Sequence, residues 1–216
     1  MKLVRYVVVL AAVLALMPAS ATVRVYDAAR MGLRPDSRAD ASAAVQRMIA
    51  KARRECREGD TVVLRFGKGR YDFYESGAVS RNYFISNHDQ TQPKRVGMAL
   101  EGFANLTVEG CGARFVCHGR MLPVALTGGE NCRLKDFEID FEQPHIAQVR
   151  IVGNDPDRGI TFLPDSGVEW RVTADSLFEY SGEGWTIRPR SGIAFNADNH
   201  HIIYRTADVA LPLKGV

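Results

Sequence analysis

Asn105-Leu106-Thr107-Val108-Glu109 recurs in similar form 26 residues later as Asn131-Cys132-Arg133-Leu134-Lys135. In both stretches an asparagine leads into a short strand-like run with an apolar residue three places on. Asn199-His200-His201-Ile202-Ile203 has the same shape again, 68 residues after the second copy. A period in the twenties is typical of one coil of a β-helix, and an asparagine repeated at a coil corner supplies a turn or stacks on its counterpart. The repeat therefore predicts a stack of short strands.

The residues before the repeat predict a cap for such a stack. Val23–Asp27 alternates as a short strand, a turn follows at Pro35-Asp36, and Thr61–Phe66 is an apolar strand that ends at glycines. Between them we expect an amphipathic helix with Asp40 as its cap, because apolar residues recur at spacings of three and four (Ala41, Val45, Met48, Ile49, Ala52 and Cys56). This order of elements resembles the opening of pectate-lyase-like right-handed β-helices, in which a helix covers the open end of the solenoid.

The stretch from Gln148 to Arg190 has a different sequence pattern. Alternating runs are separated by turn signals such as Asn154-Asp155-Pro156-Asp157, which is typical of antiparallel strands. The expected fold is therefore all-β: a right-handed parallel β-helix with an N-terminal capping helix and an antiparallel β insertion, truncated at its C-terminus. We divide it into a cap and first coils over 22–147, the insertion over 148–190, and an incomplete return to the β-helix over 191–216.

Residues 1–21 have the pattern of a signal peptide. A basic start with Lys2 and Arg5 precedes the apolar run from Tyr6 to Met17, and Ala19-Ser20-Ala21 is a small-residue cleavage site. The apolar run is too short to cross a bilayer, which takes about 20 residues. We expect cleavage after Ala21 and a secreted or periplasmic protein without a membrane span; an uncleaved N-terminal anchor is the alternative.

The remaining composition excludes several classes of protein. The leader holds two of the 28 Lys and Arg residues and none of the 25 Asp and Glu residues, which leaves 26 basic against 25 acidic side chains and gives no basis for a nucleic-acid partner. The four cysteines do not have the spacing of a zinc site, and neither a metal nor another cofactor is expected. In an exported protein the four cysteines permit at least one disulfide (Cys56, Cys111, Cys117 and Cys132). Cys111 and Cys132 each lie in a strand-like run, where cysteine is an ordinary buried small apolar residue.

Three acids on one predicted strand are candidates for chemistry. Glu138, Asp140 and Glu142 alternate with apolar residues, so a period of two places the carboxylates on the outer face and the apolar side chains in the core (Phe137, Ile139 and Phe141). The acids are either a solvated strand face, contacts for sugar hydroxyls, or a catalytic carboxyl pair, which a glycosidase needs at a separation of about 5 to 9.5 Å.

Basic and aromatic residues nearby extend this candidate surface. His145 follows the acidic strand and could contact a sugar together with Asp140 or Glu142. His118 and Arg120 could clamp a ligand, or they could close an ion pair with acids of the neighbouring coil. Trp185, like Trp170, could stack against a sugar ring or pack in a core.

Five polar and aromatic motifs carry a family resemblance. They are Tyr83–His88, Leu100–Thr107, His118–Pro123, Asp140–Gln148 and Gly182–Trp185, and they resemble the N-terminal portion of glycoside hydrolase family 110. The similarity runs from roughly residue 22 to 209. It implies an exo-acting enzyme that releases terminal α-1,3-linked galactose with inversion, takes a galactose-terminated glycan as its partner, and uses no metal or organic cofactor.

The resemblance also implies longer proteins whose catalytic acids lie beyond the equivalent of Val216. We therefore expect a fragment without the catalytic carboxylates and assign no catalytic residue, and the oligomeric state is open. One alternative is a non-catalytic glycan-binding β-helix module or adhesin. Another is a polysaccharide lyase, which would need Ca²⁺ held by clustered aspartates and an Arg or Lys base.

Overall fold

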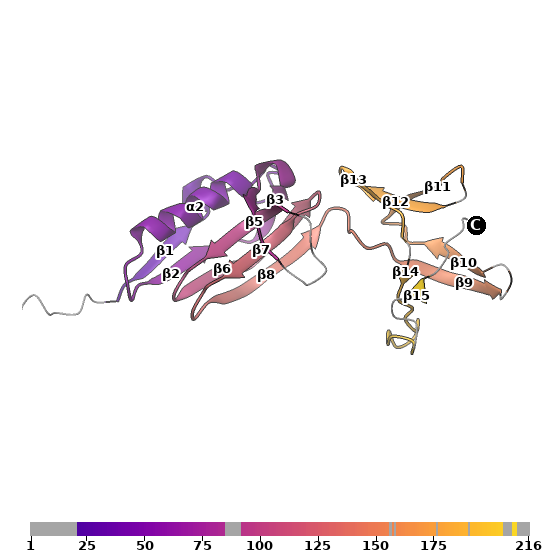
Figure 1. The fold of residues 1–216 in the computed structure, drawn as a ribbon. Helices are drawn as coiled ribbons and strands as arrows, with labels where there is room; N and C mark the ends of the chain where they lie inside the picture. The colour runs from indigo at the N-terminus through magenta and orange to yellow at the C-terminus, as the bar shows by residue number, and fades with distance from the viewer. Residues whose placement is uncertain are drawn as a thin grey trace, which may run out of the picture. The chain divides into compact units, whose positions relative to one another are not determined.

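The computed structural model describes residues 21–84, 92–155, 157, 159–175, 177–189, 191–204 and 209–210. Over these residues it consists mostly of β-strands with one α-helix (Figure 1), which confirms the expected β-rich fold with an N-terminal helix. The expected signal peptide lies outside the described residues except for Ala21, so its cleavage stays a prediction.

The elements follow one another closely along the chain. The helices are the 3-10 turn η1 (Ala29–Met31), the α-helix α2 (Ser42–Glu55) and the 3-10 turn η2 (Glu75–Gly77). The strands are β1 (Val23–Asp27), β2 (Thr61–Arg65), β3 (Gly69–Tyr74), β4 (Val79–Arg81), β5 (Lys94–Glu101), β6 (Leu106–His118), β7 (Leu122–Thr127), β8 (Arg133–Phe141), β9 (Val149–Asp155), β10 (Gly159–Pro164), β11 (Glu169–Val172), β12 (Phe178–Gly182), β13 (Trp185–Ile187), β14 (Ser191–Gly192) and β15 (Val209–Ala210).

The chain divides into two compact units. Unit 1 comprises Met1–Tyr71, Met98–Arg114 and Val124–Glu138. Unit 2 comprises Asp72–Gly97, Phe115–Pro123 and Ile139–Val216. All residues of the candidate site belong to unit 2, so the site is built within one of the two units.

Helix α2 lies against β1 and β2 in unit 1 (Figure 1). Its apolar stripe is the one predicted from the spacing, and the buried apolar side chains are Val45, Met48, Ile49 and Ala52. Ala41 occupies the N-cap position without a side-chain cap, while the carboxylate of Asp40 accepts a hydrogen bond of 2.8 Å from the backbone N–H of Ser42. Asp40 therefore satisfies one of the free N–H groups at the helix start, although it lies one residue before the N-cap position predicted for it.

The larger sheet has the strand order β1-β2-β6-β3, with β8 also paired to β6. β1 pairs with β2 in parallel, and β2 pairs with β6 in parallel. In the second pairing Val62 lies beside Leu106 and Leu64 beside Val108, and all four side chains are fully buried. Alternation along each strand thus gives this sheet one apolar face, which forms the core of unit 1.

The 26-residue repeat has a structural counterpart in its first two copies. The side-chain amide of Asn131 donates a hydrogen bond of 2.7 Å to the side-chain oxygen of Asn105, and both residues have left-handed backbone conformations with φ of 49° and 55°. Ala104 and Glu130 form a parallel bridge next to this pair. The third copy differs, because His200 rather than Asn199 has the positive φ and Ile202 pairs antiparallel with Phe195.

The other sheets are small, and the sheets together contain both parallel and antiparallel strand pairs. β4 and β5 are antiparallel, as are β9 and β10, β11 to β13, and β14 and β15. Parallel pairing occurs in the larger sheet and at the isolated bridge of the repeat. A right-handed parallel β-helix is therefore not confirmed. Antiparallel strands do occur where the insertion is expected, but its boundaries at 148 and 190 stay a prediction.

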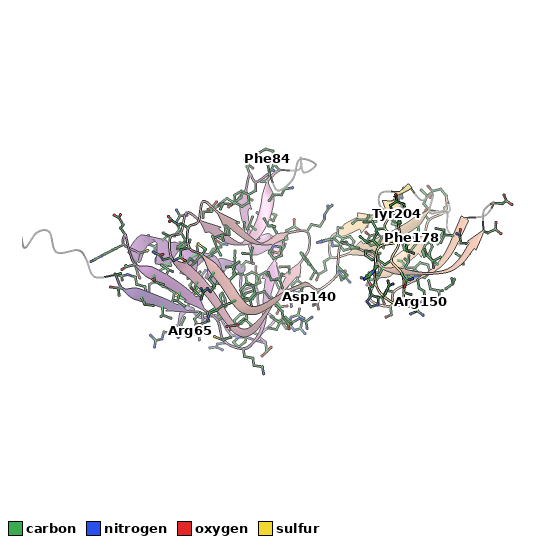
Figure 2. All side chains as sticks on the ribbon, turned by 90° about the horizontal axis from the view of Figure 1, so that it is seen from below. Arg65, Phe84, Asp140, Arg150, Phe178 and Tyr204 are labelled. Atoms are coloured by element: carbon green, nitrogen blue, oxygen red, sulfur yellow. The ribbon has the colours of Figure 1, made fainter. Side chains whose placement is uncertain are left out.

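Unit 2 has an aromatic cluster among its antiparallel strands. Phe162, Phe178, Tyr180 and Trp185 are each less than a tenth exposed and pack together. Phe178, labelled in Figure 2, meets Phe162 edge-on at a ring-centroid distance of 5.1 Å. Trp185 is thus a core residue, whereas Trp170 remains 51% exposed.

The apolar side of β8 is more exposed than the alternation predicts. Ile139 is 45% exposed, and Phe137 and Phe141 are only half-buried. Period-two spacing assigns side chains to a face of the strand, but burial also requires a layer over that face. The expectation that these three residues lie in the core is therefore only partly met, while the acids between them are exposed as expected.

The cysteines are all free thiols. Cys117 is buried, which raises the pKa of its thiol to about 12. Cys111 is exposed and has a φ of 51°, so the expectation of a buried apolar residue is wrong there. The reason is local: Cys111 and Gly112 both have left-handed conformations that bend β6 at this point.

Gly110 marks a close approach between β6 and its neighbour β8. A Cβ atom at Gly110 would lie 2.5 Å from the backbone oxygen of Asp136 and 2.4 Å from the Cβ of Phe137. We expect Gly110→Ala to lower the free energy of unfolding by about 1–3 kcal/mol, because the backbone has to move to accept the methyl group. Urea unfolding followed by circular dichroism measures this change.

Gly167→Ala is the matched control, because nothing lies within 4 Å of a Cβ at Gly167 and its backbone is outside the left-handed region. It should change the free energy of unfolding by no more than about 0.5 kcal/mol. Equal effects of the two substitutions would contradict the close contact at Gly110.

Candidate functional site

His118, at the end of β6, is held between two carboxylates. Its Nε2 lies 2.8 Å from Oδ1 of Asp72 on β3, and its Nδ1 lies 2.7 Å from Oε1 of Glu183 in the turn between β12 and β13. The imidazole is only 7% exposed and the Asp72 side chain is fully buried. The structure shows His118 in an ion pair with acids, which is one of its two alternatives.

Tyr74 and the two acids fix both the orientation and the charge of the imidazole. The rings of Tyr74 and His118 are stacked with centroids 4.0 Å apart and planes 6° apart. Burial by itself lowers the pKa of His118, but the hydrogen bonds to Asp72 and Glu183 and their negative charges outweigh it and raise the pKa above its ordinary value. The arrangement therefore favours the imidazolium.

The turn after His118 is tied to Glu183 and to one more acid. The backbone N–H of Gly119 donates to Oε2 of Glu183 at 3.2 Å, and the N–H of Arg120 donates to Oε2 of Glu75 at 3.1 Å. Gly119 has a φ of 79°, and a Cβ at this position would lie 2.7 Å from the Glu75 carboxylate. Only glycine allows the carboxylate to approach this closely in that backbone conformation.

His145 lies close to this turn in an aromatic setting. Its ring is 4.9 Å from Phe141 and 5.0 Å from Trp185, measured between centroids, and its backbone oxygen accepts a hydrogen bond of 2.9 Å from the hydroxyl of Tyr180. Burial lowers the pKa of His145, and the positive charge of Arg120 lowers it further. The pKa values of the two histidines are therefore shifted in opposite directions, downward for His145 and upward for His118.

The other residues predicted for the site are exposed. Asp140, labelled in Figure 2, is the penultimate residue of β8 and accepts a hydrogen bond of 2.9 Å from the N–H of Phe141. Glu142 follows β8, and its N–H donates to the backbone oxygen of Cys117 at 3.0 Å. The backbone thus brings Glu142 to the end of β6, beside the residue that precedes His118, and the side chain of Arg120 is exposed on the adjoining turn.

The sequence pattern does not identify Asp72 and Glu183 as partners of His118, or Glu75 as the acid that accepts from the N–H of Arg120. Alternation in Arg70–Tyr74 places Asp72 on the outer face of its strand, yet it is 1% exposed. An acid flanked by two aromatic residues in a short strand is a weak signal of a buried partner. Glu183 has a clearer signal, because it lies within Gly182-Glu183-Gly184-Trp185, one of the motifs that carry the family resemblance.

The exposed side chains of the site offer groups for hydrogen bonding. Across the residues that the structure describes, three or more His, Cys, Asp or Glu side chains do not come together in a way that could hold a metal ion. In the same part of the chain, helices long and apolar enough to cross a membrane are lacking. The exposed carboxylates and guanidinium at the site can accept from and donate to hydroxyl groups.

Comparisons with known proteins give this geometry a family context. A family model described as GLAA-B beta-barrel domain I matches residues 147–216. The chain is 54% identical over 192 residues to a protein of Bacteroides fragilis named alpha-1,3-galactosidase B, covering 89% of this chain and 32% of that protein. It is 46% identical over 193 residues to a protein of the same name from Phocaeicola vulgatus, again covering 89% of this chain and 32% of that protein.

The chain is homologous to part of the alpha-1,3-galactosidases. A third relative, alpha-1,3-galactosidase A of Bacteroides fragilis, is 30% identical over 158 residues, which cover 69% of this chain and 25% of that protein. The family resemblance drawn from the polar motifs is therefore confirmed, and the match is to an N-terminal portion. The chain spans about a third of the length of the two alpha-1,3-galactosidases B.

The pairing of His118 with Asp72 gives a stability prediction. His118→Phe keeps an aromatic ring against Tyr74 but removes both nitrogen atoms, which leaves the Asp72 carboxylate buried without its cationic partner. We expect the free energy of unfolding to fall by about 3 kcal/mol, measured by urea unfolding.

A second substitution tests the cause. Adding Asp72→Asn removes the buried charge, so the double variant should be more stable than His118→Phe alone. The exposed neighbour provides the control, because Arg120→Ala should change the free energy of unfolding by no more than about 0.5 kcal/mol. A double variant less stable than the single variant would show that the charge is not the cause.

Proposed function

We propose that the chain contributes the part of an exo-acting glycoside hydrolase that recognises terminal α-1,3-linked galactose. The observation that carries this proposal is the 54% identity to alpha-1,3-galactosidase B over 89% of the chain. Because the chain spans about a third of that relative, the activity of the whole enzyme is part of the proposal. A galactose-containing glycan is the corresponding substrate class.

The exposed residues of the site are suited to binding a sugar. Asp140 and Glu142 offer carboxylates that accept from hydroxyl groups, and Arg120 offers a guanidinium that donates to them. The partly buried rings of His145 and Phe141 meet at a centroid distance of 4.9 Å and provide an aromatic flank next to these charges. A polar rim beside an aromatic surface is a common composition for a site that orients a pyranose ring.

The catalytic carboxylates are proposed to lie outside this chain. Inversion requires one carboxylic acid to protonate the leaving oxygen and a second carboxylate to activate water on the opposite face of the ring. Asp72 and Glu183, which lie on either side of one imidazole, both bond to that ring. They are therefore engaged in holding His118 and are poorly suited to exchange protons with a glycosidic oxygen and a water.

Sugar binding and hydrolysis can be measured on the same protein. A chain of residues 22–216 should release no galactose from an α-1,3-galactoside but should bind it in isothermal titration calorimetry. The double variant Asp140→Asn, Glu142→Gln should bind at least about tenfold more weakly, because each charge-assisted hydrogen bond contributes roughly 1.5–3 kcal/mol.

Glu169→Gln on β11 removes one carboxylate charge outside the candidate site and should leave the affinity unchanged. Galactose release by the 22–216 chain would overturn the assignment of catalysis to other residues. Affinity that survives in the double variant, without hydrolysis, would favour the alternative function of a glycan-binding module or adhesin with its site elsewhere.

We also propose that the strands 26 residues apart are successive coils of a parallel β-helix. The Asn105–Asn131 hydrogen bond and the Ala104–Glu130 bridge support this, since both join residues separated by one repeat. Asn131→Gly retains access to the left-handed conformation but removes the side-chain bond, whereas Asn105→Ala also introduces backbone strain. If the asparagines hold stacked corners, urea unfolding should find Asn131→Gly less stable than the unsubstituted chain, because the bond between the two corners is lost while the backbone conformation stays accessible.

Export is the proposed fate of the protein. The basic start, the apolar run and Ala19-Ser20-Ala21 support a leader that is removed after Ala21. N-terminal sequencing of the protein recovered from a periplasmic or culture fraction should therefore begin at Thr22. A full-length protein recovered with the membrane fraction would favour the uncleaved anchor.

A further inference from the structure

The His118 cluster joins three stretches of unit 2 that are far apart in sequence. Asp72 precedes His118 by 46 residues and Glu183 follows it by 65. Both carboxylates lie within 2.8 Å of a ring nitrogen. A neutral imidazole carries only one N–H group, so the two contacts are both hydrogen bonds only when the ring is protonated.

The exposed fractions of Asp72 and Glu183 indicate which of their two contacts with His118 is lost when the imidazole gives up a proton. The Asp72 side chain is 0% exposed, so water cannot replace a hydrogen bond that this carboxylate loses. The single N–H of the neutral His118 ring is therefore needed at Asp72. The Glu183 side chain is 36% exposed and belongs to the short turn between two glycines, Gly182 and Gly184. Once the bond to Nδ1 is lost, water can solvate this carboxylate, which then keeps only the longer bond of 3.2 Å from the N–H of Gly119 to its Oε2.

We propose that His118 is a proton-operated latch: its imidazolium holds the Gly182–Gly184 turn against the end of β6, and loss of the proton releases that turn. The proposal concerns the control of the sugar-binding surface and rests on the proposed function only for its effect on binding. The latch itself is a property of the chain without any sugar.

The groups around His118 set the direction of the pH dependence. Asp72 and Tyr74 face it from β3, Glu183 from the β12–β13 turn, and Cys117 precedes it on β6. The pKa of His118 is raised in the folded chain. The protonated ring therefore makes its full contribution to the free energy of unfolding at pH values below the pKa of histidine in the unfolded chain, which is about 6.5. That contribution is lost as the pH rises through the folded pKa, so the latch opens on the alkaline side.

The turn is linked to the candidate binding surface through Trp185. Trp185 follows Glu183 by two residues, and its ring lies 5.0 Å from that of His145. Gly182 packs so closely on Trp185 that a Cβ there would lie 2.2 Å from Cζ2 of the indole. Displacement of the turn therefore has to move Trp185. The indole ring then no longer packs beside the ring of His145.

Trp185 fluorescence tests the latch directly. The chain has two tryptophans, and Trp170→Phe leaves Trp185 as the sole emitter. From about pH 5 to pH 9 its emission should shift to longer wavelength, with a midpoint above about 6.5 and with unchanged far-ultraviolet circular dichroism. A second measurement does not depend on the folding of Trp170→Phe. In an NMR titration of the unmodified chain, the indole N–H resonance of Trp185 should shift with the same pH midpoint as the ring protons of His118.

Glu183→Gln separates the latch from other titrations. An amide can accept from a protonated Nδ1 or donate to a deprotonated one, so this variant should lose the fluorescence transition. Glu169→Gln makes the same charge change on β11 and should retain it. A transition of unchanged size in Glu183→Gln, or a constant Trp185 signal across the range in the folded chain, would overturn the proposal.

The readouts also keep the two proposals distinguishable. A Trp185 transition in a chain that does not bind a galactoside would sink the proposed function and leave the latch intact. Binding that is the same on both sides of the transition would show that the turn moves without control over the sugar site, which contradicts the regulatory part of the inference.

Discussion

Burial of the Asp72 carboxylate is the constraint on which the candidate site depends. A carboxylate with a fully buried side chain has to be compensated by a cation or by hydrogen bonds, since the charge is otherwise too costly to remove from water. His118 supplies the compensation, and Tyr74 stacks on the ring and fixes its plane. Once the ring is fixed, its second nitrogen faces one direction only, and Glu183 occupies it. The positions of the β12–β13 turn and of Trp185 follow from this chain of contacts.

Much of unit 1 can be predicted because its signals are local. The spacing of Val45, Met48 and Ile49 defines a helix face, and that face is buried. The 26-residue interval between Asn105 and Asn131 corresponds to a direct contact between the two side chains. In each case the residues that carry the pattern also make the contact, so the prediction needs no knowledge of distant segments.

The candidate site is less predictable because its partners are remote. The sequence marks His118 and Arg120 as residues that either bind a ligand or pair with acids, and nothing near them in sequence decides between the two. The deciding residues, Asp72 and Glu183, lie 46 and 65 residues from His118. The predicted burial of Ile139 is wrong for a related reason, because alternation gives the face of a strand but not the layer that covers it.

The acids of the site separate into two groups with different physical roles. Asp72, Glu75 and Glu183 accept hydrogen bonds from the His118–Arg120 turn, so their charges already have protein partners. Asp140 and Glu142 have exposed side chains on and next to β8; the carboxylate of Asp140 accepts from the N–H of Phe141, and the N–H of Glu142 donates to the backbone oxygen of Cys117. The carboxylates of Asp72, Glu75 and Glu183 hold the turn, so they could not be given to a ligand without loosening the fold. The turn acids should therefore govern whether the turn is held in place, and they act through the imidazole of His118 and the backbone N–H groups that follow it.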